Sequence, residues 1–451
     1  MNKFLSFFKL KEHGTNVRTE IIAGITTFLA MAYILAVNPG YLAEAGIDKG
    51  AAFSATAISA GIATLCMAFF ANYPVALASG MGLNAFFAYT VCGSMGYSYQ
   101  VALTAILLEG IIFMILSLFK FREALVNTIP ANLKFGITAG IGLFITIIAL
   151  FNANIVVADP ATKIALGNLA APAVVLALVG LIIIGVLHHY KVPGDILLGI
   201  LITWGLGIVA ELAGWYIPNP DANLFSVIPH FSMDAFKAPL FFEFDFGFIA
   251  KNLPAFLLIM FTFLYTDIFD TVGTLIGVAE KGNLLDQDGK LPKAGGALMA
   301  DAVGTTVGAC LGTSTVTSFV ESSAGVAAGG RIGLASVVTG LLFFASLVLA
   351  PLFTTIPSFA TTPAMLYVGL LMLSAVKKVD FDLDVADTIG AFLAIIMMPF
   401  TYSIANGIMF GMLSWVILKL LIGKAKDISG VMWISVTLFA IYIALKVMGL
   451  A

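Results

Sequence analysis

The sequence predicts an all-α polytopic membrane protein. Of its 451 residues, 60% are hydrophobic and only 10% are charged, whereas a soluble domain carries about 25% charged residues. Apolar stretches that approach the roughly 20 residues of a membrane-spanning helix recur from Ile21 to the C-terminal segment 430–448. Because unpaired backbone groups are costly in lipid, segments of this kind are expected to be helical. The lipid bilayer is therefore the expected surrounding of the chain.

Composition also excludes several classes of function. The net charge of −3 lacks the basic excess of a nucleic-acid-binding protein. Three cysteines at wide spacings, Cys66, Cys92 and Cys310, and four scattered histidines predict neither a disulfide framework nor a metal site. An enzyme would need a nucleophile with its base, or a set of metal ligands. We therefore predict no enzymatic activity, no catalytic residues, no bound metal or other cofactor, and no nucleic-acid partner.

The distribution of basic residues predicts the orientation in the membrane. With a cytoplasmic N-terminus, 17 of the 22 Lys and Arg residues fall on the cytoplasmic side, as the positive-inside rule requires. Residues 1–18 mix Lys3 and Lys9 with several Phe and Leu residues and lack a cleavage site, so they are interpreted as a cytoplasmic amphipathic lead-in. We expect a multi-pass protein of the cell membrane (inner or plasma membrane).

Two halves of the chain share sequence patterns. Residues 27–33 read TFLAMAY and residues 262–268 read TFLYTDI, at an offset of 235 positions. Ile-Pro at 129–130 is matched by Ile-Pro at 356–357. Seven spans per unit is an odd number, so the second unit must be inverted relative to the first, as is common in secondary transporters.

Corresponding spans of the two halves are interrupted. Segment 75–92 contains Gly80 and Gly82 in its middle, and segment 313–329 opens with a β-favouring run, TSTVTSFV. Irregular backbone at membrane depth is tolerated only where it lines a cavity enclosed by protein, and matched interruptions indicate a binding site near the midplane. The pattern favours a transporter with alternating access over a channel.

Acidic residues inside the apolar stretches are the candidate functional groups. An ionised carboxylate at the bilayer centre costs at least ~2.5 to 3.5 kcal/mol, so an acidic residue at this depth is expected to have a structural or functional role. Asp267 and Asp270 are three residues apart and predicted to share one helix face, where they would not both ionise easily. Asn84 lies beside the first interruption. The five buried acids are Glu109, Asp267, Asp270, Asp301 and Glu321. Glu109, alone on its span, is interpreted as a structural hydrogen-bonding group.

Three segments, residues 80–87, 267–274 and 315–325, together resemble the xanthine/uracil permease superfamily, and specifically its AzgA-like branch of guanine, hypoxanthine and adenine permeases. The similarity covers about residues 14–425. It implies about 14 transmembrane segments in two inverted seven-segment repeats, with short strands in broken segments 3 and 10 and the base bound between them. By motif match, Asp270 and Glu321 would hold the base, and Gly82 and Asn84 fall on the third-segment motif.

The resemblance also implies a division into core and gate domains. The expected divisions are a lead-in at 1–18, core at 19–121, gate at 122–217, an extracytoplasmic linker at 218–247, core at 248–353, gate at 354–425 and a C-terminal hydrophobic segment at 426–451. That last segment departs from the family scheme.

The expected function is import of purine nucleobases by proton symport, with guanine or hypoxanthine favoured over adenine. Expected substrate-binding residues are Asp270, Glu321, Asn84, Gly82 and Phe319; expected proton-coupling residues are Asp267, Asp270, Asp301 and Glu321. Tyr33, Phe86, Phe87 and Tyr265 are further candidates for stacking on a base. The alternatives are a uracil or xanthine symporter, Na⁺ coupling, and an anion exchanger of the same architecture, which the clustered acids disfavour. A homodimer is an additional expectation.

Overall fold

The computed structural model describes residues 3–118, 130–218, 225–229, 236–285 and 291–447. In these residues, 11 helical stretches are long and apolar enough to cross a membrane. They are Val17–Glu44, Lys49–Phe70, Tyr99–Ser117, Ala131–Asn152, Pro172–His189, Asp195–Leu212, Leu253–Ala279, Ala294–Leu311, Gly333–Thr354, Ser358–Lys378 and Ile404–Leu421. Adding two interrupted segments and the helix Val385–Thr401 to these 11 gives 14 segments.

The elements of the first half are α1 (Lys3–Phe7), α2 (Val17–Met31), α3 (Ile34–Glu44), α4 (Lys49–Phe70), β1 (Leu77–Ser79), α5 (Met81–Ala85), the π-helix η1 (Phe86–Ser94), α6 (Tyr99–Leu118), α8 (Ala131–Asn152), β2 (Val156–Asp159), β3 (Lys163–Leu166), α9 (Pro172–His189) and α10 (Asp195–Leu212). The elements of the second half are α11 (Gly247–Lys251), α12 (Leu253–Gly282), α13 (Ala294–Leu311), β4 (Val316–Ser318), α14 (Ser322–Ala327), α15 (Gly333–Ala345), η4 (Ser346–Leu349), α16 (Ala350–Thr354), α17 (Ser358–Leu373), η5 (Ser374–Lys378), α18 (Val385–Thr401), α19 (Ile404–Leu421), η6 (Ala425–Asp427) and α20 (Gly430–Val447).

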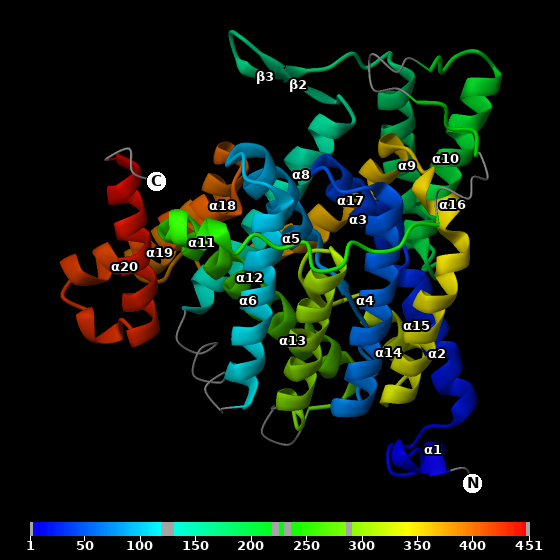
Figure 1. The fold of residues 1–451 in the computed structure, drawn as a ribbon, viewed down its shortest axis with the longest axis horizontal. Helices are drawn as coiled ribbons and strands as arrows, with labels where there is room; N and C mark the ends of the chain where they lie inside the picture. Colours follow the sequence, from blue (N-terminus) through cyan, green and yellow to red (C-terminus); the bar gives the residue numbers. More distant parts are fainter. Residues whose placement is uncertain (1–2, 119–129, 219–224, 230–235, 286–290, 448–451) are drawn as a thin grey trace.

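These helices pack in two groups, each built from both halves of the chain. The strand-bearing bundle contains α2 to α6 and α12 to α16, in which α13 and α15 both pack against α4. The flanking bundle contains α8 to α10 and α17 to α19, in which α17 and α18 both pack against α8. Helix α1 and the β2–β3 hairpin lie at opposite ends of the molecule (Figure 1). We call the end that carries α1 the N-terminal face.

A pair of short antiparallel strands joins the two halves inside the strand-bearing bundle. Ser79 of β1 lies opposite Val316 of β4, and Leu77 lies opposite Ser318. Two further hydrogen bonds extend the pairing at its ends, Phe319 N to Ala76 O at 3.0 Å and Gly80 N to Thr315 O at 3.0 Å. Both strands are buried. Each strand hydrogen-bonds backbone N–H and C=O groups of the other, which lipid could not do. The prediction of short strands in the third and tenth segments is confirmed.

Side chains at the ends of segments explain where several helices begin. Asp48 accepts hydrogen bonds from the backbone of Gly50 at 3.0 Å and Ala51 at 3.1 Å, and so caps α4. The first segment, expected as one helix over 21–37, is instead divided: α2 ends at Met31 and α3 begins at Ile34. The turn between them places Tyr33 in the interior.

The hydrophobic segment at the C-terminus forms one helix of 18 residues, α20. It packs against α12 of the strand-bearing bundle and α19 of the flanking bundle. Lys120, Arg122 and Lys290, three of the basic residues assigned to the cytoplasmic side, lie outside the described residues, as does the expected division between residues 121 and 122.

Two glycines allow α8 and α18 to touch backbone to backbone. A Cβ atom at Gly136 would lie 2.8 Å from the carbonyl oxygen of Ala391, and one at Gly140 would lie 2.6 Å from that of Ala394. Small residues four positions apart are a common means of close packing between membrane helices.

Gly140→Leu is therefore expected to destabilise the flanking bundle by about 1 to 3 kcal/mol, because the added side chain must push α18 away. The loss is measured by denaturant titration of the purified protein in mixed micelles. Gly185→Leu on α9 is the matched control, since a Cβ there meets nothing within 4 Å. Equal stability of the two variants would contradict the assigned packing.

A buried lysine ties α18 to α19. Lys419 Nζ lies 2.8 Å from Asp384 Oδ2 and 2.9 Å from Asp387 Oδ2, and its side chain is 6% exposed. Lys424 contacts the same Asp384 oxygen at 2.7 Å but is 52% exposed. Hydrogen bonds from the two lysines hold the pKa of Asp384 well below its ordinary value.

Lys419→Met is expected to lower the free energy of unfolding by about 3 kcal/mol, because two carboxylates then face each other without their buried cation. Lys424→Met, the control, is expected to cost below about 1 kcal/mol. Since the folded-state pKa of Asp384 is lowered, the contribution is fully present above pH ~4 and declines as the pH falls further. Denaturant titrations at pH 7 and in acid test both statements; similar losses in the two variants at pH 7 would refute the first.

Candidate functional site

Glu321 lies where the second strand-bearing segment becomes helical again. It is the N-cap residue of α14, three positions beyond the last residue of β4. The hydroxyl of Tyr33 donates a hydrogen bond of 2.6 Å to Glu321 Oε1. The ring of Tyr33 also lies 6.4 Å from that of Phe319, at an angle of 48°. The break between α2 and α3 thus brings a hydroxyl and an aromatic face to the carboxylate.

Asp270 is the second acid of this site. It lies on α12, close enough to Glu321 for their negative charges to repel one another. Neither carboxylate forms an ion pair in the described part of the chain. Both are only partly buried, and the adjacent Val320 is 47% exposed. Because carboxylates facing lipid would be costly, this surface is expected to face water or substrate.

A second group of acids lies deeper in the strand-bearing bundle. Glu109, Asp267 and Asp301 are completely buried, and the carboxyl group of Asp267 neighbours both of the others. Thr315 donates to Glu109 Oε2 at 3.1 Å, and Thr271 donates to Asp301 Oδ1 at 2.7 Å. The expectation that Asp267 and Asp270 form one pair is therefore refined: they lie on the same helix beside different partners.

The threonines of the second strand-bearing segment connect this buried group to the strands. Thr315 and Thr317 are two residues apart and so point to the same side. Thr317 Oγ1 lies 2.6 Å from Thr271 Oγ1, which in turn contacts Asp301. Hydroxyl groups thus satisfy part of the polar surface of the acids, as buried polar groups require. Among the described residues, no group of three or more His, Cys, Asp or Glu side chains is arranged to hold a metal ion.

Asn84 and Gly82 occupy structural positions in the first strand-bearing segment. Asn84 is completely buried; its Oδ1 accepts a hydrogen bond from Ser314, and its Nδ2 donates to the carbonyl of Ser79 at 3.4 Å. A Cβ atom at Gly82 would lie 2.5 Å from Cγ2 of Ile141 on α8. Gly82 therefore lets α5 approach the flanking bundle, and its expected role in substrate binding stays a prediction, as does that of Asn84.

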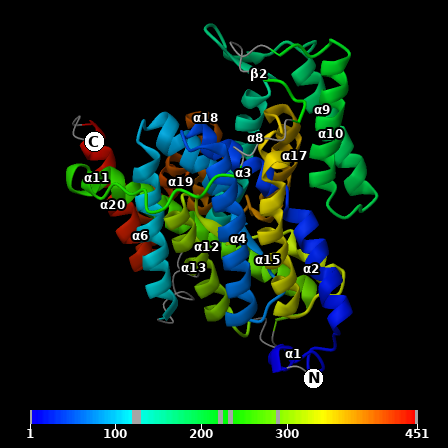
Figure 2. The ribbon, with the colours of Figure 1, turned by 45° about the vertical axis from the view of Figure 1, so that its right-hand side comes forward.

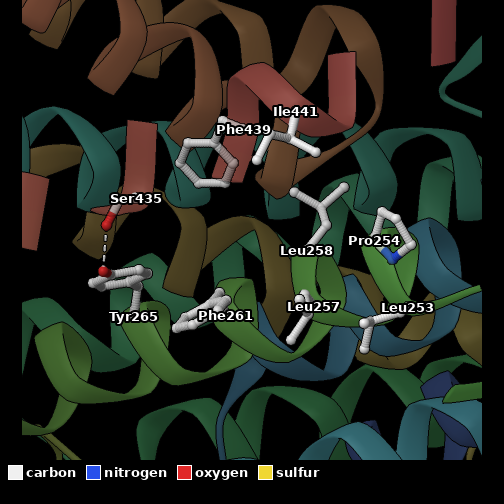
Figure 3. A pocket seen from close by; sticks show the side chains of 9 residues that line it. All are labelled: Leu253, Pro254, Leu257, Leu258, Phe261, Tyr265, Ser435, Phe439 and Ile441. Atoms are coloured by element: carbon white, nitrogen blue, oxygen red, sulfur yellow. Dashed lines mark hydrogen bonds between the residues drawn. The ribbon is translucent and has the colours of Figure 1, made fainter. Parts of the chain in front are cut away.

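The aromatic candidates separate into two sets. Tyr33 and Phe319 lie at Glu321, as described above. Phe86 is completely buried and packs edge-on against Phe263 at 4.8 Å. Phe87 is also completely buried. Tyr265 is directed away from the site, toward α20, where its hydroxyl bonds Ser435 (Figure 3).

Two cavities lie beside these elements. The larger, about 790 Å³, is lined by a mixture of polar and apolar groups and lies between α3, η1 and the flanking bundle; it extends from Ala36, one turn beyond Tyr33, to Tyr41, Tyr89 and Asn152. The other, about 200 Å³, lies between α12 and α20 and is lined mainly by aliphatic and phenyl groups (Figure 3). Its two hydroxyl groups bond each other, so it offers little to a polar ligand.

Comparison with known sequences identifies the family. A sequence model of the xanthine/uracil permeases, described as the Permease family, matches residues 18–410. The chain belongs to the xanthine/uracil permease family. This permease is 40% identical to the adenine permease AdeP of Escherichia coli (strain K12), over 97% of the chain and 95% of that protein. It is 42% identical to the guanine/hypoxanthine permease PbuG of Bacillus subtilis (strain 168), over 97% and 98%.

Solved structures confirm the fold. The transmembrane domain of a cyanobacterial bicarbonate transporter, BicA, superposes with a TM-score of 0.64 at 15% identity and covers 86% of this permease and 97% of that chain. The likeness establishes the fold of two inverted repeats and nothing of the substrate. The relatives are permeases, so this protein is a membrane transporter and not an enzyme. Helix α20 lies beyond the family match, which ends at residue 410.

Proposed function

We propose that this permease imports purine bases with protons, and that Glu321 and Asp270 hold the base. The observation that carries the proposal is a pair of carboxylates beside Tyr33 and Phe319 that form no ion pair among the described residues. Carboxylates accept hydrogen bonds from the ring N–H groups of a base, and an aromatic ring can stack on its face. The names of the adenine and guanine/hypoxanthine permeases among its relatives support a purine substrate.

The acids favour guanine and hypoxanthine over adenine. Both oxopurines carry a donor at ring position N1, which a carboxylate accepts, whereas adenine carries an acceptor there and would face the carboxylate unfavourably. Uracil and xanthine also present ring N–H donors and remain the second candidate. An anion exchanger of the BicA type is disfavoured, because the two acids carry negative charge and form no ion pair with a cation in the part of the chain that the structure describes.

Coupling to protons follows from the charge of the site. Moving two carboxylates through the membrane is expensive unless a proton neutralises at least one of them. Glu321 and Asp270 would exchange protons at the substrate, while Asp267 and Asp301 would hold protons in the deeper group with Glu109. In this scheme the strand-bearing bundle is the moving core, the flanking bundle is the gate, and the N-terminal face is cytoplasmic. In the same scheme the 790 Å³ cavity, which Glu44, Lys49 and Asn152 line, would open toward the extracytoplasmic side.

The test is uptake of radiolabelled hypoxanthine, guanine, adenine and uracil into cells that lack their own nucleobase transporters. Purine uptake that a protonophore abolishes, and that unlabelled hypoxanthine suppresses more strongly than uracil, is the expected result. Uptake that depends on a Na⁺ gradient instead would show that Na⁺, and not the proton, is the coupling ion. Well-expressed protein that transports only uracil or xanthine would refute the purine assignment.

A further inference from the structure

The hairpin of α9 and α10 carries a histidine–aspartate pair at its tip. His188 lies in the last turn of α9 and Asp195 begins α10, and a short link that includes Gly194 joins the two helices. His188 Nδ1 lies 2.7 Å from Asp195 Oδ2. The histidine side chain is 58% exposed and the aspartate side chain 17% exposed, so the pair runs from the protein interior to its surface. Figure 2 shows this hairpin at the edge of the molecule, beside α17.

The same tip touches the strand-bearing bundle next to the substrate site. Gly194 adopts a left-handed conformation with φ of +73°, and a Cβ there would lie 3.0 Å from the carbonyl oxygen of Leu29 on α2. Leu29 precedes Tyr33, the hydrogen-bond partner of Glu321, by one helical turn. The carboxyl group of Asp195 is close enough to that of Glu321 for their charges to interact.

Few other titratable groups face the pair. From α17, the ring of Tyr367 lies 5.2 Å from the ring of His188, and its hydroxyl senses the charge of Asp195. His189 packs edge-on against its neighbour Tyr190. Lys191 is exposed at the turn. Glu321 is thus the acid of the strand-bearing bundle that interacts with Asp195.

We propose that Asp195 and His188 form the proton exit from Glu321. This inference rests on the proposed proton symport and names its release route. In this route the proton leaves the carboxyl of Glu321, crosses to the carboxylate of Asp195 through water, and passes to Nδ1 of His188 in its Nε2–H tautomer. The imidazolium then loses a proton from Nε2 to water. Glu321 and Asp195 return to their carboxylate forms, and exchange of the remaining Nδ1 proton with water restores the Nε2–H tautomer of His188 for the next cycle.

The chemistry of the three groups suits this sequence. Imidazole can accept a proton at one ring nitrogen and release one from the other, and the His188 side chain is 58% exposed. Asp195 is hydrogen-bonded to the exposed His188, and its neighbour Gly194 packs against Leu29, one turn before the tyrosine that bonds the partly buried Glu321. Because Glu321 and Asp195 belong to different bundles, a relative displacement of the bundles would break the route. Release would then occur only when the site is on the side of the hairpin tip.

Two transport modes in proteoliposomes separate proton release from substrate binding. Net uptake driven by a pH gradient requires the carrier to lose its proton in every cycle, whereas exchange of labelled for unlabelled substrate does not. We expect Asp195→Asn and His188→Gln each to lower net uptake at least about 10-fold and to leave exchange within about 2-fold. A positioned proton-transfer group typically contributes about 10²–10⁴-fold to a rate. His189→Gln, the matched control, is expected to preserve both modes.

The outcomes distinguish this inference from the function on which it rests. A wild-type protein that takes up no purine along a pH gradient would refute the proposed symport itself. A coupled wild-type protein whose Asp195→Asn and His188→Gln variants keep full net uptake would refute the exit route alone. Equal losses of net uptake and exchange would also overturn it, because they would indicate a defect of binding or of bundle movement. Dependence of His188→Gln net uptake on luminal pH should be weaker than that of wild type.

Discussion

Glu321→Gln is expected to lower purine uptake at least about 100-fold while leaving the amount of protein in the membrane unchanged. The amide is nearly the same size, but it carries no charge to strengthen a hydrogen bond to a ring N–H and cannot release a proton. A hydrogen bond to a charged group contributes about 1.5 to 3 kcal/mol, and 1.4 kcal/mol corresponds to a factor of ten. Loss of proton coupling adds to this effect.

The measurement is initial uptake of labelled hypoxanthine, normalised to protein in the membrane. Tyr33→Phe, which removes the 2.6 Å hydrogen bond to Glu321 but keeps the ring, should lower uptake about 10-fold. Glu44→Gln is the control acid, because Glu44 lines the 790 Å³ cavity and has no contact with Glu321 among the described hydrogen bonds. Normal uptake by Glu321→Gln would place the base elsewhere, as would equal losses in all three variants.

Gly82→Val is expected to abolish most of the uptake through a different cause. The added side chain would meet Ile141 of α8, since a Cβ alone already lies 2.5 Å from Cγ2 of that residue. The collision falls at the boundary between the two bundles, where α5 packs against α8. It should therefore hinder relative movement of the bundles, with a loss of at least about 10-fold, the equivalent of 1.4 kcal/mol.

A second substitution tests this explanation. Ile141→Ala removes the side chain that the valine would strike, so the double variant Gly82→Val with Ile141→Ala should recover at least half of the wild-type uptake. Ile141→Ala alone is expected to transport normally. If uptake stays low in the double variant while binding of hypoxanthine to the purified protein is also lost, Gly82 belongs to the substrate site, as the family motif implies. The recovery of uptake in the double variant measures the energetic coupling between positions 82 and 141.

Local patterns predicted the elements that carry the site. Glycines at Gly80 and Gly82 and the threonine-rich run after Gly312 indicated breaks in two membrane segments, and the structure confirms a strand in each. The cost of burying acids identified Asp270 and Glu321 before any contact was known. The inference of the strands succeeded because the bilayer penalises irregular backbone strongly, while the assignment of Asp270 and Glu321 to the substrate site stays a prediction.

The contacts of the site were beyond local patterns. The break that delivers Tyr33 to Glu321 lies within a run of residues with good helical propensity, and only packing against elements far along the chain defines it. Likewise, the spacing of Asp267 and Asp270 placed them on one face of a helix, but their partners come from three other segments. The sequence shows His188 only as one of four scattered histidines, because its position relative to Asp195 and Glu321 depends on how two bundles meet.

The strand pair also constrains how the protein is made. The backbone of Ser79 pairs with that of Val316, which is synthesised 237 positions later in the chain. At about 5 to 20 residues per second of synthesis, that delay is roughly 12 to 47 s. During this interval the third segment cannot rest in lipid in its final form, because its amide groups would be unpaired. The first half of the chain is thus an obligate intermediate, sheltered by the insertion machinery or held as a provisional helix until the tenth segment arrives.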